Sequence, residues 1–345
     1  MRYIGSKTLL LDQIENVIRE NINIPLGIFC DIFSGTASVA RHFKKYHQII
    51  SNDLLHFSYA LQVGSLQNNS QPSFRKLKQI LINDPLVYLN SANISKDAFK
   101  QAPFIFENFS PNDKSERQYL SNDNALRIDY IRQTIEDWNS RDLITSGEYY
   151  YLLAALIEAI PFVSNIAGTY GAYLKHWDKR AHKKLVMERL AIIDNNKNNQ
   201  CFNIDSNELI KDIEGDILYI DPPYNSRQYL PNYHLLETVS RYDSPPLKGK
   251  TGLRPYDDAK SKYCAQATVH NAFRDLIKSA RFKHIVVSYS SEGLMPEAEI
   301  ESALKEYGVE STYKLYRLPY RRYKRTSNHV DHSLEEFLFY IQKSI

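Results

Sequence analysis

Four consecutive residues, Asp221-Pro222-Pro223-Tyr224, combine groups that could hold a planar base by its amino group. They directly follow the apolar run 216–220, which predicts a strand, and open α/β folds bind ligands at the carboxyl ends of such strands. The two prolines fix φ and remove two N–H donors, so the turn is stiff and rich in acceptors. The Asp221 carboxylate adds an acceptor for amino hydrogens, and the Tyr224 ring offers a face for stacking. A plain Pro-Pro turn ending a strand, the alternative, requires neither the acid nor the ring.

A second group of candidate residues lies in the hexapeptide DIFSGT, Asp31–Thr36, and at Asp53. One glycine, Gly35, at a strand-to-helix turn lets a ligand approach the backbone closely. Asp53 ends the next predicted strand, at about the spacing where an acid in these folds binds ribose hydroxyls. The chain lacks a GxGxxG fingerprint, which favours a nucleoside-bearing cofactor other than NAD. An equal alternative for Asp53 is a capping acid before a helix that begins at Leu54.

Both candidate groups need strands that end beside them, and the apolar pattern supplies such strands. Short apolar runs predict strands at 26–33, 48–50, 201–204, 216–220 and 284–288, and helical spacing predicts helices at 7–22, after Thr36 and at 54–61. Repeated strand–turn–helix units indicate an α/β fold with a parallel sheet and helical crossovers. Two further extended segments, 311–320 and 334–341, predict an antiparallel hairpin at the sheet edge.

The strand pattern is interrupted by a long segment, residues 63–199, which is polar and rich in Asn and Tyr. Helical patterns occur within it at 123–138, 148–160 and 179–193. We therefore expect a mainly helical inserted subdomain at 63–199 and a sheet domain made of residues 1–62 and 200–345. The polar run Asn195–Asn199 is the expected joint.

Composition excludes several classes of protein. The chain has 345 residues, 43% hydrophobic side chains and three cysteines without a CxxC pair, which argues against a disulfide framework and a structural zinc site. The longest apolar stretch, 149–163, contains Glu158 and is too short to span a bilayer. No signal peptide is apparent, so we expect a cytoplasmic protein without membrane contact. His234 and Glu237 share one helical face but lack a third ligand nearby, and we interpret them as helix surface rather than as a metal site.

Charge is distributed unevenly despite a net value of only +3. Cations and tyrosines alternate without an acid between Ser311 and Asn328, namely Lys314, Arg317, Arg321, Arg322, Lys324 and Arg325 with Tyr313, Tyr316, Tyr320 and Tyr323. Cations suit a phosphate backbone and aromatic rings suit stacking on a base. A solvated surface ribbon explains such a run equally well, so this segment depends on support from elsewhere.

The ordered motifs of the chain resemble those of a known family, the D12-class, Dam-like adenine-N6 DNA methyltransferases. The resemblance is carried by RYIGSK (Arg2–Lys7), DIFSGT (Asp31–Thr36), Asn52-Asp53, Asn203-Ile204-Asp205 and DPPYNSRQY (Asp221–Tyr229). Within that class, DPPYNSRQY and GTYGAYLK (Gly168–Lys175) resemble the branch of type II and type IIS restriction–modification systems. The resemblance covers residues 1–62 and 200–341. This chain has Thr36-Ala37 where the family often has a second glycine.

The resemblance implies a Rossmann-like methyltransferase sheet that uses S-adenosylmethionine to methylate a flipped adenine in double-stranded DNA. By position, the cofactor residues would be Tyr3, Lys7, Asp31, Phe33, Gly35, Asp53, Phe202 and Asp205. The target base would be held by the catalytic tetrapeptide Asp221, Pro222, Pro223 and Tyr224. DNA contacts are expected at Arg227, Lys175, Arg321, Arg322, Lys324 and Arg325. The inserted subdomain would recognise the target sequence, and no metal is expected.

Other functions remain open at this point. The same chemistry could act on cytosine N4, on RNA adenine or on a protein glutamine, although Asp rather than Ser or Asn at position 221 favours adenine. A catalytically silent DNA-binding subunit is disfavoured because Lys7, Asp53 and the whole tetrapeptide are present. A nicotinamide-dependent oxidoreductase is disfavoured by the missing glycine fingerprint. We expect a monomeric modification enzyme of a restriction–modification system, with a cognate restriction endonuclease as a possible partner.

Overall fold

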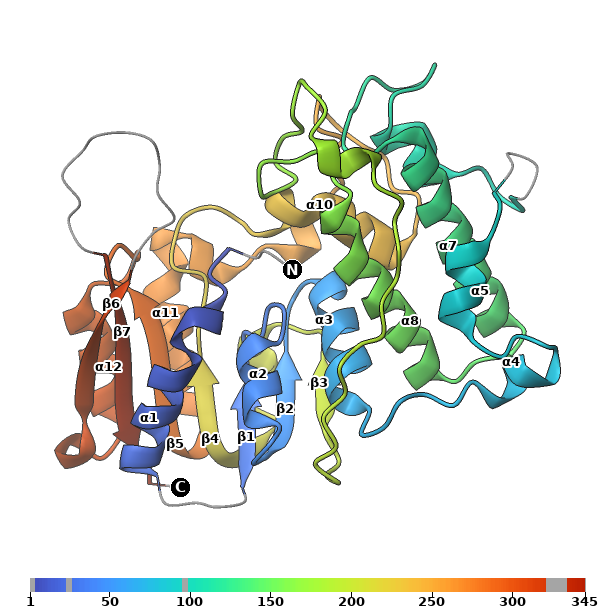
Figure 1. Cartoon of the computed structure of the whole chain (residues 1–345). Helices are drawn as coiled ribbons and strands as arrows, with labels where there is room; N and C mark the ends of the chain where they lie inside the picture. The colour runs from blue at the N-terminus through green and yellow to red at the C-terminus, as the bar shows by residue number, and fades with distance from the viewer. Residues whose placement is uncertain (1–3, 23–26, 95–98, 321–333, 345) are drawn as a thin grey trace. The chain divides into compact units, whose positions relative to one another are not determined.

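The computed structural model describes residues 4–22, 27–94, 99–320 and 334–344, and the chain forms two compact units (Figure 1). Unit 1 comprises Met1–Ser6, Leu55–Asn196 and Tyr229–Ala259, and unit 2 comprises Lys7–Leu54, Lys197–Gln228 and Lys260–Ile345. Residues 55–62 and 229–259, predicted as part of the sheet domain, therefore lie with the helical insert in unit 1. Among the described residues, every helix is too short or too polar to span a membrane.

Unit 2 is built on one mixed sheet of seven strands (Figure 1). The strands are β1 Ile28–Asp31, β2 Gln48–Asn52, β3 Gln200–Phe202, β4 Glu214–Ile220, β5 Arg281–Ser290, β6 Lys314–Tyr320 and β7 Leu334–Gln342. Their order is β3-β2-β1-β4-β5-β7-β6, and the first five run parallel while β7 is antiparallel to both β5 and β6. This arrangement confirms the predicted Rossmann-like sheet with an antiparallel edge hairpin.

The strand order reverses between β1 and β4. From β1 the chain continues to β2 and β3 on one side, whereas β4 and β5 extend the sheet on the other side. In the register of this pair, Asp31 lies opposite Tyr219. Loops that leave neighbouring parallel strands in opposite directions open a crevice at the carboxyl edge, and α/β folds bind ligands there. The two candidate groups from the sequence, after β1 and after β4, meet at this point.

Helices cover both faces of the sheet in unit 2. They are α1 Leu11–Asn21, which follows the 3-10 turn Lys7–Leu10, and α2 Ser38–Phe43, α9 Ser206–Leu209, α11 Gln266–Ser279 and α12 Glu297–Tyr307. Alternate residues of β4 serve opposite faces, as expected for a strand. Leu218 and Ile220 join a buried cluster with residues of α11 and α12. Tyr219 packs 6.2 Å from Phe29, which stacks on Phe43 of α2 at 4.4 Å between ring centroids.

Among the described residues of unit 1, the regular elements are helices, joined by long irregular segments. Its helices are α3 His56–Gln62, the π-helix Val63–Gln67, α4 Arg75–Gln79, α5 Pro85–Ser91, α6 Phe104–Phe109, α7 Asn122–Ser140, α8 Ser146–Ala159 and α10 Leu230–Arg241. The predicted helices at 123–138 and 148–160 are confirmed as α7 and α8. Helix α8 begins with a capping box between Thr145 and Glu148, and its residues 151–157 are all buried.

The helix predicted over 179–193 is wrong. Only Lys179–His182 forms a short 3-10 helix, and the chain then runs without regular structure. Side chains from distant segments accept its backbone N–H groups: Asn124 that of Leu185 and Asn90 that of Met187, each at 2.9 Å. These bonds replace the intrahelical bonds that the sequence pattern implied, and Leu185, Met187 and Leu190 of the segment are buried.

A pair of hydrogen bonds joins the two places where the chain leaves and re-enters unit 2. The Gln228 side-chain amide donates to the Ser261 carbonyl at 3.0 Å, and the Ser261 backbone N–H donates to the Gln228 side-chain oxygen at 2.8 Å. The segment Tyr229–Ala259 of unit 1 lies between these two residues in sequence.

Candidate active site

A buried cluster of three charged residues lies beside the predicted catalytic tetrapeptide. Lys7 Nζ is 3.1 Å from Asp221 Oδ1 and 2.7 Å from Glu336 Oε1. Lys7 precedes α1, Asp221 directly follows β4 and Glu336 lies in β7, so three elements of unit 2 build the cluster. Lys7 is 5% exposed and Glu336 4%, whereas the Asp221 side chain is 18% exposed. Asp221 is therefore the member of the cluster that a ligand can reach.

The electrostatics of the cluster follow from its composition of one cation and two acids. Burial is the largest influence on Asp221 and raises the pKa of its carboxyl to about 7, with a further rise from Glu336 and an opposing influence from Lys7. Burial opposes the charge on Lys7, but the two carboxylates outweigh it and raise the pKa of the ammonium. Lys7 thus stays protonated, while Asp221 exchanges its proton near neutral pH.

The turn that carries Asp221 is anchored at its far end. The backbone carbonyl of Tyr224 accepts a hydrogen bond from the Leu294 N–H at 2.8 Å, which ties the turn to the loop after β5. Within the described residues, no backbone N–H donates to the Pro222 carbonyl. A carboxylate that is partly exposed and a carbonyl with unused lone pairs thus stand one residue apart, as the sequence predicts for an amino-binding corner.

The turn after β1 contains a buried carboxylate with an unused oxygen. Asp31 is 1% exposed, and its Oδ2 accepts from the Ser34 hydroxyl at 3.1 Å. Its Oδ1 is buried and has no hydrogen-bond partner among the residues that the structure describes. Burial, with a smaller contribution from Asp221, raises the pKa of Asp31 to about 8. An unsatisfied buried acceptor is costly unless a ligand supplies a donor.

Backbone geometry in the same turn is left-handed at two residues. Gly35 has φ 51°, which glycine adopts freely, and Ala37 has φ 62° and ψ 25° at the N-cap of α2. Ala37 thus adopts a left-handed conformation that glycine would adopt more easily, because Ala37 carries a Cβ atom and glycine does not.

Asp53 supports this turn. Its Oδ2 accepts from the Gly35 N–H at 2.9 Å, and its backbone carbonyl accepts from the Asn203 side chain at 2.8 Å. Leu55 is the N-cap residue of helix α3 and contributes no side-chain hydrogen bond to it. The printed contacts of Asp53 thus tie the end of β2 to the turn after β1.

The remaining predicted cofactor residues line the edge of the same sheet. Phe33 packs edge-to-face against Tyr263 with ring centroids 4.9 Å apart. Phe202 ends β3 and is partly buried against the unit 2 core. Asp205 caps α9 by accepting from the Asn207 N–H at 2.9 Å, and its second oxygen lies 3.6 Å from Lys262 Nζ. Unit 2 thus brings Lys7, Asp31, Phe33, Gly35, Asp53, Phe202 and Asp205 onto one framework with the tetrapeptide.

The predicted DNA contacts are more dispersed. Arg227 lies three residues before the start of α10 and is exposed, and its side chain makes no ion pair with any described residue. Lys175 is exposed in unit 1. In the basic segment, Lys314 pairs with Glu20 at 3.2 Å and Arg317 with Glu297 at 2.7 Å, so these two cations are already neutralised. Tyr3, Arg321, Arg322, Lys324 and Arg325 lie outside the described residues.

Sequence reasoning missed three residues of the site: Glu336, Ser288 and Tyr263. Ser288 of β5 donates to Glu336 Oε1 at 2.5 Å, and the Tyr263 hydroxyl donates to the Asn207 side chain at 2.9 Å. None of them belongs to a contiguous motif. The available signal for Glu336 was an acid at the start of the apolar run Phe337–Ile341, where a buried strand position carries a charge.

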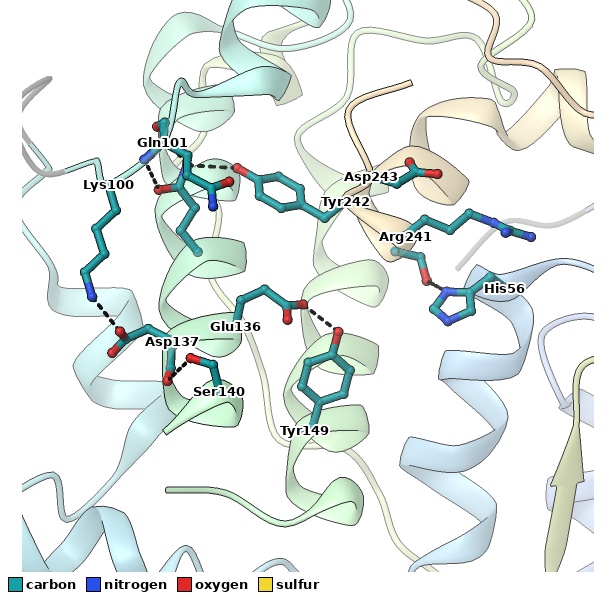
Figure 2. Close-up of a pocket in the computed structure, with 12 residues that line it drawn as sticks. His56, Lys100, Gln101, Glu136, Asp137, Ser140, Tyr149, Arg241, Tyr242 and Asp243 are labelled. Carbon is teal, nitrogen blue, oxygen red and sulfur yellow. Dashed lines mark hydrogen bonds and ion pairs between the residues drawn. The ribbon is translucent and has the colours of Figure 1, made fainter. Parts of the chain in front are cut away.

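Unit 1 holds a polar cavity of about 740 Å³ that differs from the cluster in unit 2 (Figure 2). Its lining residues are His56, Lys100, Gln101, Gln133, Glu136, Asp137, Ser140, Tyr149, Ser240, Arg241, Tyr242 and Asp243. In Figure 2, Lys100 points to Asp137, at 2.5 Å, and the Tyr149 hydroxyl points to Glu136, at 2.6 Å. Lys100 and Asp137 thus pair within the lining, whereas Glu136, Arg241 and Asp243 form ion pairs with Arg132, Glu237 and Arg254, which are not lining residues.

His234 and Glu237 of α10 are fully buried, so their interpretation as helix surface is wrong. Glu237 accepts from the backbone N–H groups of His56 and Phe57, at 3.1 and 3.0 Å, and so caps α3 from a distance. His234 Nε2 lies 2.8 Å from the Tyr170 carbonyl. Among the described residues, no three His, Cys, Asp or Glu side chains gather as metal ligands would.

The arrangement of the sheet and the tetrapeptide agrees with the comparison to known proteins. Residues 3–302 match the family described as D12 class N6 adenine-specific DNA methyltransferase, and the chain belongs to this family. The resemblance stated from the motifs is thereby confirmed.

Individual relatives are type II modification enzymes by name. The chain is 52% identical over 345 residues to the Type II methyltransferase M.FokI of Planomicrobium okeanokoites, and 43% identical over 343 residues to the Modification methylase StsI of Streptococcus sanguinis. These matches cover 100% and 99% of this chain but 53% and 52% of the relatives, so the chain spans about half their length. It is also 37% identical over 356 residues to the Type II methyltransferase M.NlaIII of Neisseria lactamica, with 100% of both proteins covered.

Proposed function

We propose that this protein transfers a methyl group from S-adenosylmethionine to N6 of an adenine in double-stranded DNA, as the modification enzyme of a restriction–modification system. The observation that carries the proposal is the position of Asp221. It stands at the end of β4, beside the point where the strand order reverses, partly exposed and bonded to Lys7. The D12-class family of the chain supports adenine as the target.

The residues after β1 fit the proposed cofactor. A methionine ammonium group would supply the donor that the buried Asp31 Oδ1 lacks. The left-handed turn at Gly35 keeps the backbone open to close approach, and Asp53 holds that turn in place. S-adenosylmethionine, when bound, supplies an electrophilic methyl group on a sulfonium. Its other contacts would come from Tyr3, Lys7, Phe33, Phe202 and Asp205.

The tetrapeptide would prepare the target nitrogen. The N6 lone pair of adenine is delocalised into the ring, which makes the amino group a weak nucleophile. Acceptance of its two hydrogens by Asp221 and the Pro222 carbonyl would bias the nitrogen toward sp³ geometry and localise that lone pair. Pro222 and Pro223 keep the two acceptors fixed, so orientation supplies part of the rate acceleration.

The adenine must leave the duplex to reach this corner. Turning out a base costs roughly a few kcal/mol of stacking and pairing, which stacking on Tyr224 would partly recover. The exposed cations Arg227 and Lys175 would contact phosphates, as would Arg321, Arg322, Lys324 and Arg325. We assign target recognition to the helical insert 63–199. A monomer that works beside a cognate restriction endonuclease in the cytoplasm completes the proposal.

The direct test uses methyl-labelled S-adenosylmethionine and plasmid DNA, followed by digestion to nucleosides. We expect label in N6-methyl-2′-deoxyadenosine only, and none with the Asp221→Ala variant. Label in N4-methylcytosine, or label only when RNA or protein replaces DNA, would transfer the proposal to that acceptor. DNA binding without any label would indicate the silent subunit instead.

A further inference from the structure

Glu336 is a buried acid that no contiguous motif of the chain includes. It lies in β7, is 4% exposed and binds Lys7 Nζ at 2.7 Å, closer than the 3.1 Å between Lys7 Nζ and Asp221 Oδ1. Its distance in sequence from Lys7 is 329 residues, so the fold alone brings the two together. An ionised carboxylate that is buried without a partner costs free energy. The contact with Lys7 is therefore what allows an acid at this position of β7.

We propose that Glu336 is a positioning residue that draws the Lys7 ammonium toward itself and so prevents Lys7 from saturating Asp221. The Asp221 carboxylate then keeps both its basicity and a lone pair for the amino hydrogens of the target base. This inference rests on the proposed function, because it assigns to Asp221 the role of amino acceptor.

The geometry of the sheet fixes Glu336 for this role. Ser290 is the register partner of Glu336 and Ser288 is that of Leu338, so Ser288 and Glu336 are diagonal neighbours on one face of the β5–β7 pair. The fully buried Ser288 hydroxyl donates to Glu336 Oε1 at 2.5 Å. Glu336 Oε1 therefore accepts hydrogen bonds both from the Ser288 hydroxyl of β5 and from Lys7 Nζ, which precedes α1. These two bonds fix the position of the Glu336 carboxylate.

The charges around Asp221 explain why a second acid matters. The charged or titratable groups near Asp221 are the Lys7 ammonium, the Glu336 carboxylate, the Asp31 carboxyl and the phenol of Tyr219, which lies two residues earlier on β4. Lys7 alone would lower the basicity of Asp221 and occupy its oxygens. Glu336 balances that cation, and its charge together with burial raises the pKa of Asp221 to about 7.

The test is Glu336→Gln in the full-length chain, which keeps an oxygen for Lys7 and Ser288 but removes the charge. We expect the single-turnover methylation rate at pH 8 to fall about tenfold, because Lys7 then pairs more fully with Asp221 and leaves its carboxylate a weaker acceptor. The acid midpoint of the pH–rate profile should move to lower pH. Binding of S-adenosylmethionine in the absence of DNA should stay within about twofold of wild type.

A matched control is Glu335→Gln, which removes the neighbouring charge from the opposite face of β7. Glu335 lies 3.6 Å from Arg317 and contacts none of the cluster residues among the described contacts. Its rate and its acid midpoint should equal those of wild type. If Glu336→Gln does not fold, Glu336→Asp decides: the shorter carboxylate keeps its charge but withdraws from Lys7, so the rate should fall several-fold with a nearly unchanged midpoint.

Three outcomes would overturn the inference: a wild-type rate and midpoint in Glu336→Gln, a lowered rate without a shift of the midpoint, or a wild-type rate in Glu336→Asp when only that variant folds. Failure of the proposed function is distinguishable, because wild-type protein would then produce no N6-methyl-2′-deoxyadenosine in the same assay.

Discussion

The two units bury carboxylates in different ways. In unit 1, Asp129 accepts from the backbone N–H groups of Ile105 and Phe106 at 3.0 and 2.8 Å and from the Tyr242 hydroxyl at 2.7 Å. Glu237 likewise binds two backbone N–H groups at the start of α3. In unit 2, Asp221 and Glu336 share the side chain of one residue, Lys7.

Under the proposed function, the first kind of carboxylate holds the fold and the second kind takes part in the chemistry. Burial raises the pKa of Asp129 to about 7, just as it does that of Asp221, so a displaced pKa alone does not mark the active site. The type of hydrogen-bond partner distinguishes the two carboxylates. Backbone N–H groups fix a carboxylate to one helix end, whereas a lysine shared between two carboxylates leaves lone pairs for a ligand.

The largest expected effect is that of Asp221→Ala on methyl transfer. Loss of the acceptor should lower the single-turnover rate by about a thousandfold or more, since a single oriented polar contact in a transition state contributes on that scale. The affinity for S-adenosylmethionine, measured by calorimetry without DNA, should change little. Unchanged turnover would show that the residue does not hold the amino group.

Asp129→Ala should have the opposite profile. It leaves two backbone N–H groups and a hydroxyl without an acceptor in a buried place, which should cost about 3 kcal/mol of unfolding free energy. Urea denaturation measures this loss, and the rate per folded molecule should stay at the wild-type value. A large loss of rate with unchanged stability would place Asp129 in catalysis and break the distinction between the units.

The pH dependence of transfer sharpens the same distinction. In the proposed function Asp221 accepts amino hydrogens most strongly when it is ionised, and its pKa is raised to about 7. The single-turnover rate should therefore be highest above that pH and fall about tenfold for each unit below it. A rate that stays constant down to pH 5 would mean that Asp221 keeps an ordinary carboxyl pKa.

The smallest effect is expected at Ala37, on the turn that faces the cofactor site. Ala37→Gly relieves a left-handed conformation, although glycine also gains freedom in the unfolded chain. We expect a net gain of about 0.5 kcal/mol in unfolding free energy, read from urea denaturation, and an unchanged affinity for S-adenosylmethionine. A loss of stability would mean that the Ala37 methyl group packs better than its backbone conformation suggests.

Much of unit 2 was predictable because its signals are local. The strands from β1 to β5 coincide with short apolar runs in the sequence. The residues that follow β1 and β4 are of types that indicate a binding site, a glycine turn with acids and an Asp-Pro-Pro-Tyr run. The segment 183–193 was not predictable in the same way, because Asn90 and Asn124, distant in sequence, provide its backbone partners. The place of Glu336 in the site could not be predicted for the same reason, because it depends on a contact with Lys7 at the other end of the chain.

The reciprocal bonds between Gln228 and Ser261 have a consequence for how this protein can diversify. They clamp the two stems of the excursion Tyr229–Ala259 at its base, only seven residues beyond Asp221. These bonds therefore limit how far a change within the excursion can displace the loop that carries Asp221. The mostly exposed loop 243–250 of the excursion can therefore vary while the corner at Asp221 keeps its shape, whereas α10 in the same excursion is held by its buried residues.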